Sequence, residues 1–412
     1  MGKNLILLTN YFPYYKGEEY IESELPILAK KFENILIISC LIGENEPQTR
    51  EVPENVSVMS TGKNNTKLFK LKMFMEGLLK YPYKLNKNIL NQLYEMYFIE
   101  RSNFLFEAIE DELGKKLNKH FDSSNTIIYS YWFYLTAKMG LDINNLFFDN
   151  KCKVITRAHR YDIYENFSAL NFLPLRTKLL DELNYVFPVS EDGTQYLINQ
   201  YPDYTDKIKT KYLGTKPNTT RIQPATDELV IFSCSGIRKI KRIDRIINVI
   251  ENIKNKGIKV KWYHIGDGEL ATKYEKIATA KLTTDTFKFL GRIPNEKVVS
   301  EYKAKGAHFF INLSDSEGIP VSIMEALSVG LPVIATDVGG TREIINSNVG
   351  CLIDVQTKDE EIANKITELY KQNNNEYIQM QQNCIKNWEN NFNSEKNYNN
   401  FSDLLIDLVG GE

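Results

Sequence analysis

Twelve short apolar runs, rich in β-branched residues, alternate with longer segments of helical periodicity along this chain. The runs are Leu5–Leu8, Ile35–Ser39, Val56–Met59, Ile127–Tyr129, Val154–Thr156 and Val186–Val189, then Leu229–Ser233, Val260–Ile265, Phe287–Leu290, His308–Ile311, Val333–Ala335 and Cys351–Ile353. Continuous apolar runs of this length are typical of parallel strands that helices bury on both faces. With 412 residues the chain is long enough for two domains. The pattern predicts an α/β protein with two doubly wound domains in tandem.

The polar stretch 214–224 is the predicted boundary between the two domains, because it is poor in large apolar residues. We expect an N-terminal domain over 1–214, a C-terminal domain over 225–385, and a final helix over 386–412 that packs back on the first domain. Residues 63–120 interrupt the strand rhythm and are predicted to form a helical insertion. Its first part, 67–84, is basic, aromatic and amphipathic.

Composition excludes several classes of function. The formal net charge is −2, so electrostatic attraction to nucleic acid is not indicated. The five cysteines are scattered and show no C-x-x-C spacing, which favours reduced thiols over a zinc site or a disulfide framework. An apolar core of only four residues, Leu5–Leu8, precedes Thr9 at the start of the chain, which is too short for a signal peptide. No stretch has the length of a membrane span. We expect a cytoplasmic protein.

Two acids near the end of the second half, Glu317 and Glu325, are separated by seven residues that contain a glycine turn and a proline. The run before them is a predicted strand, so Glu317 lies in the loop that leaves its carboxyl end, where open α/β sheets bind ligands. Pro320 favours the first turn of a following helix. The amide groups there attract an anion, whereas carboxylates repel one another and suit neutral hydroxyls. The pattern predicts a site for an anionic ligand rich in hydroxyls.

A basic loop opens the second half of the chain in the same way. It follows the predicted strand 229–233 and contains Gly236, Arg238 and Lys241 before a helix. Together with Glu317 and Glu325, these residues resemble the donor site of retaining, nucleotide-sugar-dependent glycosyltransferases of family 4, the glycosyl transferases group 1.

That family has the GT-B fold, in which two Rossmann-like domains face each other across a cleft and a C-terminal helix crosses back to the first domain. The resemblance implies that Glu317 holds hydroxyls of the donor sugar and that Glu325 holds the ribose. It assigns the donor diphosphate to Lys241 and to an arginine five positions earlier. Here Gly236 occupies that arginine's position, and Arg238 is the candidate to replace its charge.

The resemblance also assigns contacts to the first half and to several turns. His159 matches the histidine of the first domain that faces the donor sugar, and Gly17 matches a loop that usually carries two glycines. The further donor-binding candidates are Gly266, Gly268, Arg292, Ile293, Gly318, Ile319, Pro320 and Val321. A histidine or glycine after a strand can equally be structural. The sequence alone leaves both interpretations open.

The implied reaction is transfer of a sugar from a UDP- or GDP-sugar to a saccharide or lipid-linked acceptor, with retention of anomeric configuration, in synthesis of a bacterial surface polysaccharide. The chain contains no Asp-x-Asp pair. We therefore expect no metal and no cofactor, with fixed cations and helix amides stabilising the leaving diphosphate. The basic segment 67–84 suggests contact with an anionic membrane surface, against the alternative of an ordinary solvated helix. Two kinds of competing interpretation remain. One is an enzyme of the same fold with another reaction, a nucleotide-sugar epimerase or a phosphorylase, and the other is an accessory subunit of another transferase.

Overall fold

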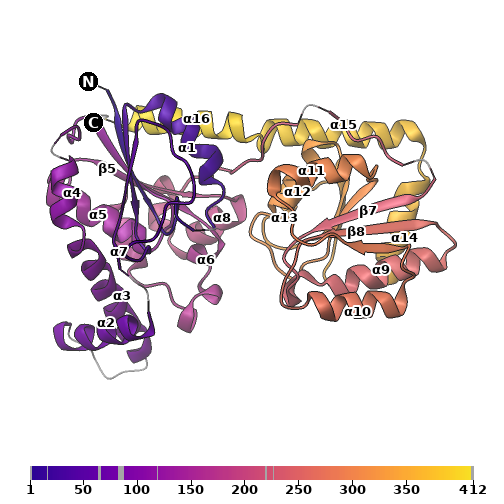
Figure 1. The fold of residues 1–412 in the computed structure, drawn as a ribbon, viewed down its shortest axis with the longest axis horizontal. Coiled ribbons are helices and arrows are strands. Elements are labelled where there is room, and N and C mark those ends of the chain that lie inside the picture. The colour runs from indigo at the N-terminus through magenta and orange to yellow at the C-terminus, as the bar shows by residue number, and fades with distance from the viewer. Residues whose placement is uncertain are drawn as a thin grey trace. The chain divides into compact units, whose positions relative to one another are not determined.

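The computed structural model describes residues 2–15, 17–63, 66–81, 88–117, 119–218, 220–225 and 227–409. The chain divides into two compact units, unit 1 with residues 1–213 and 395–412 and unit 2 with residues 214–394 (Figure 1). Each of the twelve predicted runs forms a strand, and both sheets are parallel throughout the described residues. The prediction of two doubly wound α/β domains is therefore confirmed.

Unit 1 contains a sheet in the order β3-β2-β1-β4-β5-β6. Its strands are β1 (Asn4–Thr9), β2 (Asn34–Ser39), β3 (Val56–Ser60), β4 (Thr126–Ser130), β5 (Lys153–Ala158) and β6 (Tyr185–Pro188). Its helices are α1 (Ile21–Lys31), α2 (Lys67–Lys80), α3 (Ile89–Glu107), α4 (Glu110–Leu117), α5 (Leu135–Phe148), α6 (Arg160–Ile163), α7 (Arg176–Glu182), α8 (Glu191–Gln200) and α16 (Ser394–Leu408), with the 3₁₀ turns η1 (Glu165–Phe167), η2 (Ala169–Asn171) and η3 (Pro202–Lys207).

Both faces of this first sheet are buried, as its continuous apolar strands require. Leu5 and Leu7 of β1 face one hydrophobic core, which α1 and α16 cover, and Ile6 and Leu8 face the other. The order of strands reverses between β1 and β4, so the loops that follow these two strands diverge at the carboxyl edge of the sheet.

The insertion predicted over 63–120 is helical, and α2, α3 and α4 account for it within the described residues. The Phe69 ring on α2 packs against Phe104 on α3 with ring centroids 5.2 Å apart. Phe98 on α3 packs against Tyr134 at the start of α5, at 4.7 Å. These contacts attach α2 and α3 to the body of unit 1 (Figure 1). Of the predicted amphipathic segment 67–84, residues 82–84 lie outside the described part of the chain.

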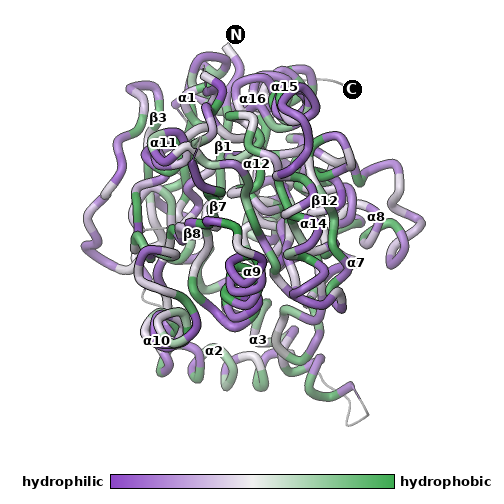
Figure 2. The backbone as a smooth tube through the Cα atoms, turned by 90° about the vertical axis from the view of Figure 1, so that its right-hand side faces the viewer, coloured by the Kyte–Doolittle hydropathy of each residue, from purple (hydrophilic) through white to green (hydrophobic). Residues whose placement is uncertain are grey.

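Unit 2 repeats the same topology in the order β12-β11-β10-β7-β8-β9. Its strands are β7 (Leu229–Cys234), β8 (Val260–Ile265), β9 (Phe287–Phe289), β10 (Phe309–Asn312), β11 (Val333–Thr336) and β12 (Gly350–Ile353). Its helices are α9 (Ile243–Asn255), α10 (Ala271–Lys281), α11 (Asn295–Ala304), α12 (Val321–Ser328), α13 (Thr341–Ile344), α14 (Asp359–Lys371) and α15 (Asn374–Asn391), with the 3₁₀ turn η4 (Lys239–Lys241). In Figure 2 the tube of α9 alternates between hydrophilic and hydrophobic segments, and its isoleucines are buried against the sheet.

The C-terminal region differs from the expected single helix over 386–412. The chain leaves the helical conformation after α15, and α16 begins at Ser394. The break forms because the backbone of Thr215 donates to the Phe392 carbonyl at 2.9 Å and accepts from the Ser394 amide at 3.0 Å. The Trp388 indole also donates to the Thr215 hydroxyl at 2.7 Å. As a result, residues 214–224 and 386–394 belong to unit 2.

Helix α16 itself packs on unit 1, as the sequence predicted for the end of the chain. Phe401, Leu405 and Val409 are buried in the core that Leu5 and Leu7 face, and α16 lies beside α1 (Figure 1). All five cysteines are free thiols, in agreement with their scattered spacing.

Candidate functional site

Two loops of unit 2 carry the chemistry that the sequence indicated, and they follow β7 and β10. These strands are neighbours at the point where the strand order reverses. In open α/β sheets this switch point is the place where ligands bind. The fold therefore brings together Lys241 and Glu317, which are 76 residues apart in the sequence.

The Lys241 ammonium and the Glu317 carboxylate form an ion pair. Lys241 Nζ donates to Glu317 Oε1 at 2.6 Å and to Oε2 at 2.8 Å. Glu317 Oε1 also accepts from Asn312 Nδ2 at 3.1 Å and from Ser314 Oγ at 2.6 Å. Glu317 is 8% exposed, and the Lys241 side chain is 23% exposed. The Glu317 carboxylate is thus fixed by hydrogen bonds from three side chains, while the Lys241 ammonium retains access to solvent.

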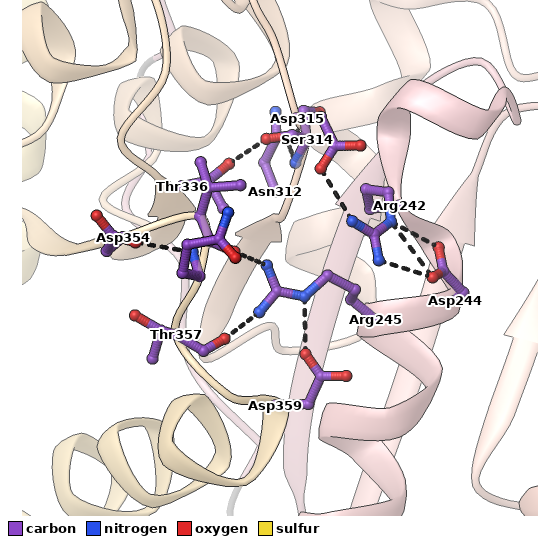
Figure 3. Close-up of polar contacts among 12 residues, drawn as sticks. Arg242, Asp244, Arg245, Asn312, Ser314, Asp315, Thr336, Asp354, Thr357 and Asp359 are labelled. Carbon is purple, nitrogen blue, oxygen red and sulfur yellow. Dashed lines mark hydrogen bonds and ion pairs between the residues drawn. The ribbon is translucent and has the colours of Figure 1, made fainter.

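The residues beside this pair fix the position of both loops. Arg242 adopts a left-handed conformation with φ +48°, and its guanidinium binds Asp244 at 3.1 Å and Asp315 at 3.0 Å. The Asp315 amide donates to the Ile240 carbonyl at 2.8 Å. Figure 3 shows Arg242 between the two aspartates. Since Lys241 precedes Arg242 and Asp315 lies on the loop of Glu317, this ion-pair network holds the two loops together.

Helix α12 begins directly after the Glu317 loop, with Pro320 as its N-cap residue. Glu325 lies in its second turn and is half-buried. Burial raises the pKa of Glu325 to about 7. Burial also raises the pKa of the Cys234 thiol to about 12, and the nearby Glu325 carboxylate contributes to that shift. Glu325 therefore stands close to the end of β7, at the same switch point as Lys241 and Glu317.

The two glycine turns that follow β8 and β11 have a steric reason for their glycines. A Cβ atom on Gly266, where φ is +135°, would lie 1.9 Å from the Ser235 carbonyl oxygen, and one on Gly339, where φ is +50°, would lie 2.1 Å from the Glu317 carbonyl oxygen. A side chain on Gly268 would similarly meet the backbone of Ile237, at 2.5 Å. These glycines allow neighbouring loops to pack backbone to backbone. Their role as donor contacts stays a prediction.

The other predicted donor residues lie on the same edge of the sheet. Gly236 is exposed, and a Cβ atom there would come no nearer than 3.8 Å to other atoms, so packing does not exclude an arginine at this position. Arg238 and Arg292 are exposed, and Ile293 is half-buried. Gly318, Ile319 and Val321 flank Pro320 at the start of α12.

In unit 1, His159 lies after β5 and is only 9% exposed. Its ring packs against Tyr131 at 4.9 Å and against Trp132 at 4.5 Å between centroids. Burial, followed by the positive charge of Arg157, lowers the pKa of His159 to about 3, so the imidazole is neutral near pH 7. Among the described residues its Nε2 atom has no hydrogen-bond partner. A neutral ring does not serve as a fixed cation.

Asp162 organises the loop around His159 and was not singled out in the sequence. Its carboxylate accepts from the His159 amide at 2.5 Å and from the Phe133 amide at 2.7 Å. Arg176 donates to the Asp162 carbonyl at 2.5 Å. Burial raises the pKa of Asp162 to about 7, although Arg176 opposes the shift. Asp162 lies three positions after His159, the N-cap residue of α6, which is the spacing of a capping box. This spacing could have identified Asp162 from the sequence.

Glu18 is a second organiser that the sequence did not reveal. Its carboxylate accepts from the backbone amides of Asn10 at 2.8 Å, Tyr11 at 2.7 Å and Phe12 at 2.6 Å, and from the Trp132 indole at 2.5 Å. The loop after β1 is thereby tied to the loop after β4. Gly17, with φ +103°, lies on this loop, and no atom would lie within 4 Å of an added Cβ. The loops border a cavity of about 490 Å³ at the switch point of unit 1.

Comparison with known proteins identifies the family of unit 2. Residues 216–390, which include Lys241, Glu317 and Glu325, match the family model described as glycosyl transferases group 1. Unit 2 is a group 1 glycosyltransferase domain. The prediction made from the donor motifs is confirmed at this level.

Three curated relatives illustrate the match. A phosphatidylinositol N-acetylglucosaminyltransferase component of Arabidopsis thaliana is 28% identical over 34% of this chain and 30% of its own length. An amylovoran biosynthesis glycosyltransferase of Erwinia amylovora is 27% identical over 35% of this chain and 37% of its length. An N-acetyl-alpha-D-glucosaminyl L-malate synthase of Bacillus anthracis is 23% identical over 66% of this chain and 74% of its length. The chain spans about a third of the length of the first two.

Solved structures support the fold across both units. A sucrose-phosphate synthase from Thermosynechococcus elongatus gives a TM-score of 0.72 at 15% identity and covers 100% of both chains. A lipopolysaccharide outer core galactosyltransferase gives 0.67 at 13% identity, covering 98% of this chain and 99% of its own. An Anabaena protein in complex with UDP gives 0.66 at 15% identity, with the same coverage. The two-domain GT-B fold is thus confirmed, and at these identities the likeness concerns the fold alone.

Proposed function

We propose that this protein is a retaining glycosyltransferase that moves a sugar from a UDP- or GDP-sugar to a saccharide or lipid-linked saccharide acceptor. The observation that carries the proposal is the Lys241–Glu317 pair, which lies at the switch point of a group 1 glycosyltransferase domain. Names of relatives support a place in surface-polysaccharide synthesis, since they include amylovoran and O-antigen biosynthesis glycosyltransferases.

Each group of the site has a part in this proposal. Lys241 faces the donor diphosphate, because it is the partly exposed member of the pair. Glu317 accepts hydrogen bonds from sugar hydroxyls with the lone pairs that its protein partners leave free. Arg238 adds a second cation beside Lys241. The amides at the start of α12 bind an anion through the helix dipole.

The chemical step asks the site to stabilise negative charge on the departing diphosphate oxygen. Fixed cations and amide dipoles do this without reorganising during the reaction. The acceptor hydroxyl attacks from the face that the diphosphate leaves, and the departing phosphate oxygen takes the hydroxyl proton. Configuration at the anomeric carbon is thereby retained. We assign to His159, as a neutral ring, the role of orienting the sugar; its buried Nε2 has no protein hydrogen-bond partner among the described residues.

We further propose that this chemistry needs no metal ion. Within the described residues, no group of three His, Cys, Asp or Glu side chains is arranged to hold one. The support for the proposal is positive: Lys241 and Arg238 supply charge where a divalent cation would otherwise act.

The test is a donor screen on the full chain in buffer with EDTA, in which UDP, GDP and their common sugar conjugates are examined for thermal stabilisation and for nucleotide release. We expect one base to raise the melting temperature and one sugar nucleotide to be turned over when an acceptor is present. Nucleotide release that is independent of any acceptor would favour the epimerase interpretation. No stabilisation by any nucleotide would favour the accessory-subunit interpretation.

We also propose that α2 places the protein on an anionic bilayer surface. One stripe of α2 carries large apolar side chains that are exposed: Leu68 at 78%, Leu71 at 58%, Met75 at 52% and Leu79 at 85%. The opposite side of the helix is attached to unit 1 through the buried Met73 and Gly77. Figure 2 shows α2 with alternating hydrophobic and hydrophilic segments.

Charge supports an anionic surface as the partner of this stripe. Lys67, Lys70, Lys72 and Lys80 are exposed on α2. Lys72 pairs with Glu76 at 3.7 Å and Lys80 with Glu100 at 2.5 Å, so Lys67 and Lys70 carry most of the charge available to a surface. Apolar insertion combined with lysine attraction is the physical basis of interfacial helices. No helix in the described ranges is long and apolar enough to cross a bilayer.

Sedimentation with vesicles tests this membrane proposal. The full chain should bind vesicles of phosphatidylcholine with phosphatidylglycerol and bind phosphatidylcholine alone weakly. The double variant Leu71→Gln/Leu79→Gln should lose binding, while the matched variant Leu146→Gln, at an exposed leucine on α5 (49%), should keep it. Equal binding by wild type and the double variant would refute the proposal.

A further inference from the structure

The cavity of unit 1 is bordered by the loops after β1 and β4 and by one residue of the helical insertion. Its volume is about 490 Å³, within the range of small-molecule sites. Arg101, on α3, reaches it from residues 63–120, the part of the chain where the family motifs are absent. The cavity therefore combines a shared loop framework with a side chain particular to this chain.

The walls of this cavity are largely aromatic. Trp132, Tyr134, Tyr161 and Tyr11 line it. The Trp132 and Tyr161 rings lie 4.8 Å apart between centroids, and the Tyr161 hydroxyl accepts from Asn10 Nδ2 at 3.2 Å. The Tyr134 hydroxyl is bound to that of Tyr94 at 2.5 Å. Aromatic faces with a few fixed polar groups suit the apolar face and hydroxyl edge of a sugar ring.

Arg101 and Glu18 are the charged residues that line the cavity, and they differ in how far protein groups satisfy their hydrogen-bonding capacity. The Glu18 carboxylate is saturated by three backbone amides and the Trp132 indole. Arg101 is half-buried, and its guanidinium forms no ion pair with an acid in the described part of the chain. Its Nε atom is buried without a hydrogen-bond partner there, and its side chain donates a hydrogen bond to the Tyr97 hydroxyl oxygen.

A half-buried arginine that has no carboxylate partner loses part of its hydration without a compensating protein charge, and an anionic ligand can supply that charge. Because guanidinium groups bind carboxylates and phosphates through paired N–H donors, the N–H donors of Arg101 that Tyr97 does not use suit such groups. We propose that this cavity is the acceptor subsite and that it takes a sugar carrying a carboxylate or a phosphate, whose charge Arg101 binds. The inference rests on the proposed function and adds a substrate class to it.

Calorimetric titration of the full chain tests the inference with three probes: methyl β-D-glucuronide as carboxylate, glucose 6-phosphate as phosphate, and methyl β-D-glucoside as neutral control. UDP is titrated into each variant as an independent measure of the donor site. We expect at least one anionic probe to bind about 10-fold or more tightly than the neutral sugar. The probe that binds more tightly shows whether the site prefers a carboxylate or a phosphate on the sugar.

Variants separate the role of Arg101 from that of net charge. Arg101→Gln should weaken binding of the anionic probe by about 10- to 100-fold, while Arg101→Lys should keep part of it. Lys115→Gln removes one exposed charge from the adjacent α4 and should change nothing. UDP binding should be the same in all variants, and circular dichroism should report an intact fold.

Two results would overturn the inference while leaving the transferase proposal in place. One is UDP binding by the wild type with no binding of either anionic probe at millimolar concentration. The other is an Arg101→Gln variant that binds the anionic probe as well as the wild type. Failure of the wild type to bind any nucleotide would instead refute the proposed function itself.

Discussion

Units 1 and 2 share one strand order, yet the loops at the carboxyl edges of their sheets carry different chemistry. In unit 2 the switch point presents a partly exposed ion pair, Lys241–Glu317, and loops that pack through glycines. In unit 1 the carboxyl edge of the sheet presents a buried, neutral histidine after β5, and a saturated carboxylate and aromatic walls at the switch point. The sheet fixes where the loops meet, and the side chains decide what can bind there.

The difference extends to how each unit uses its ions. Arg157 and Glu24 in unit 1 form a pair whose side chains are 0% and 2% exposed. Arg245 and Asp359 in unit 2 form a comparable pair, but they are 7% and 21% exposed (Figure 3). The Arg157–Glu24 pair of unit 1 is therefore fully inside the core, whereas the Asp359 carboxylate of the unit 2 pair stays partly in contact with solvent.

The largest expected effect is on the free energy of unfolding, and it concerns the Arg157–Glu24 and Arg245–Asp359 pairs. Arg157→Met leaves the Glu24 carboxylate buried and removes hydrogen bonds to the Tyr129 hydroxyl at 2.7 Å and the Lys211 carbonyl at 2.9 Å. We expect a loss of about 3–5 kcal/mol in the free energy of unfolding, measured by urea denaturation. Arg245→Met should cost less, because Asp359 remains partly solvated. Equal costs would show that the two units do not differ in this respect.

The second effect concerns the donor loops. Lys241→Met should lower the rate of nucleotide release by about 10²- to 10³-fold, the usual cost of removing one group that stabilises a developing oxyanion. Lys239→Met, an exposed lysine of the same 3₁₀ turn, is the matched control and should keep the wild-type rate. A common loss in both variants would mean that bulk charge, and not the Lys241–Glu317 geometry, supports the reaction.

The third effect is a dependence of stability on pH. The pKa of His159 falls from 6.5 to about 3 on folding, mainly because of burial. Between these values the unfolded chain binds the proton that the folded chain excludes, so stability falls as the pH is lowered from about 6.5. His159→Phe should remove up to about 1.4 kcal/mol per pH unit from that slope. The check is urea denaturation between pH 7.5 and 4.5.

Unit 2 offers a parallel measurement, since burial lowers the pKa of His264 to about 4. His264→Phe should also reduce the loss of stability on acidification. Its effect should extend from about pH 6.5 down to about pH 4, whereas that of His159→Phe extends to about pH 3. A slope that neither substitution changes would contradict the assignment of both histidines as neutral in the folded protein.

The strands were predictable because a buried parallel strand is recorded locally, as a continuous apolar run. The twelve runs and the helical insertion therefore appear where the sequence placed them. Glu317, Lys241 and the glycine turns were also recognisable, since each lies in a loop that follows a strand. The resemblance supplied their roles, which stay predictions.

What the sequence did not reveal depends on contacts between distant segments. The ion pair between Lys241 and Glu317 joins two loops that are far apart in the chain. The saturation of Glu18 requires Trp132, which is 114 residues away. The approach of Arg101 to the cavity requires the packing of α3. The break before Ser394 requires the backbone of Thr215. Local patterns carry no information on such pairings.

The central claim is that unit 2 binds a nucleoside diphosphate through fixed cations and helix amides. Calorimetric titration of the full chain with UDP and GDP in the presence of EDTA tests it most directly. We predict binding of at least one of the two by the wild type and a loss of about tenfold or more in the Lys241→Met variant. No heat of binding from either nucleotide, or unchanged affinity in Lys241→Met, would contradict the claim.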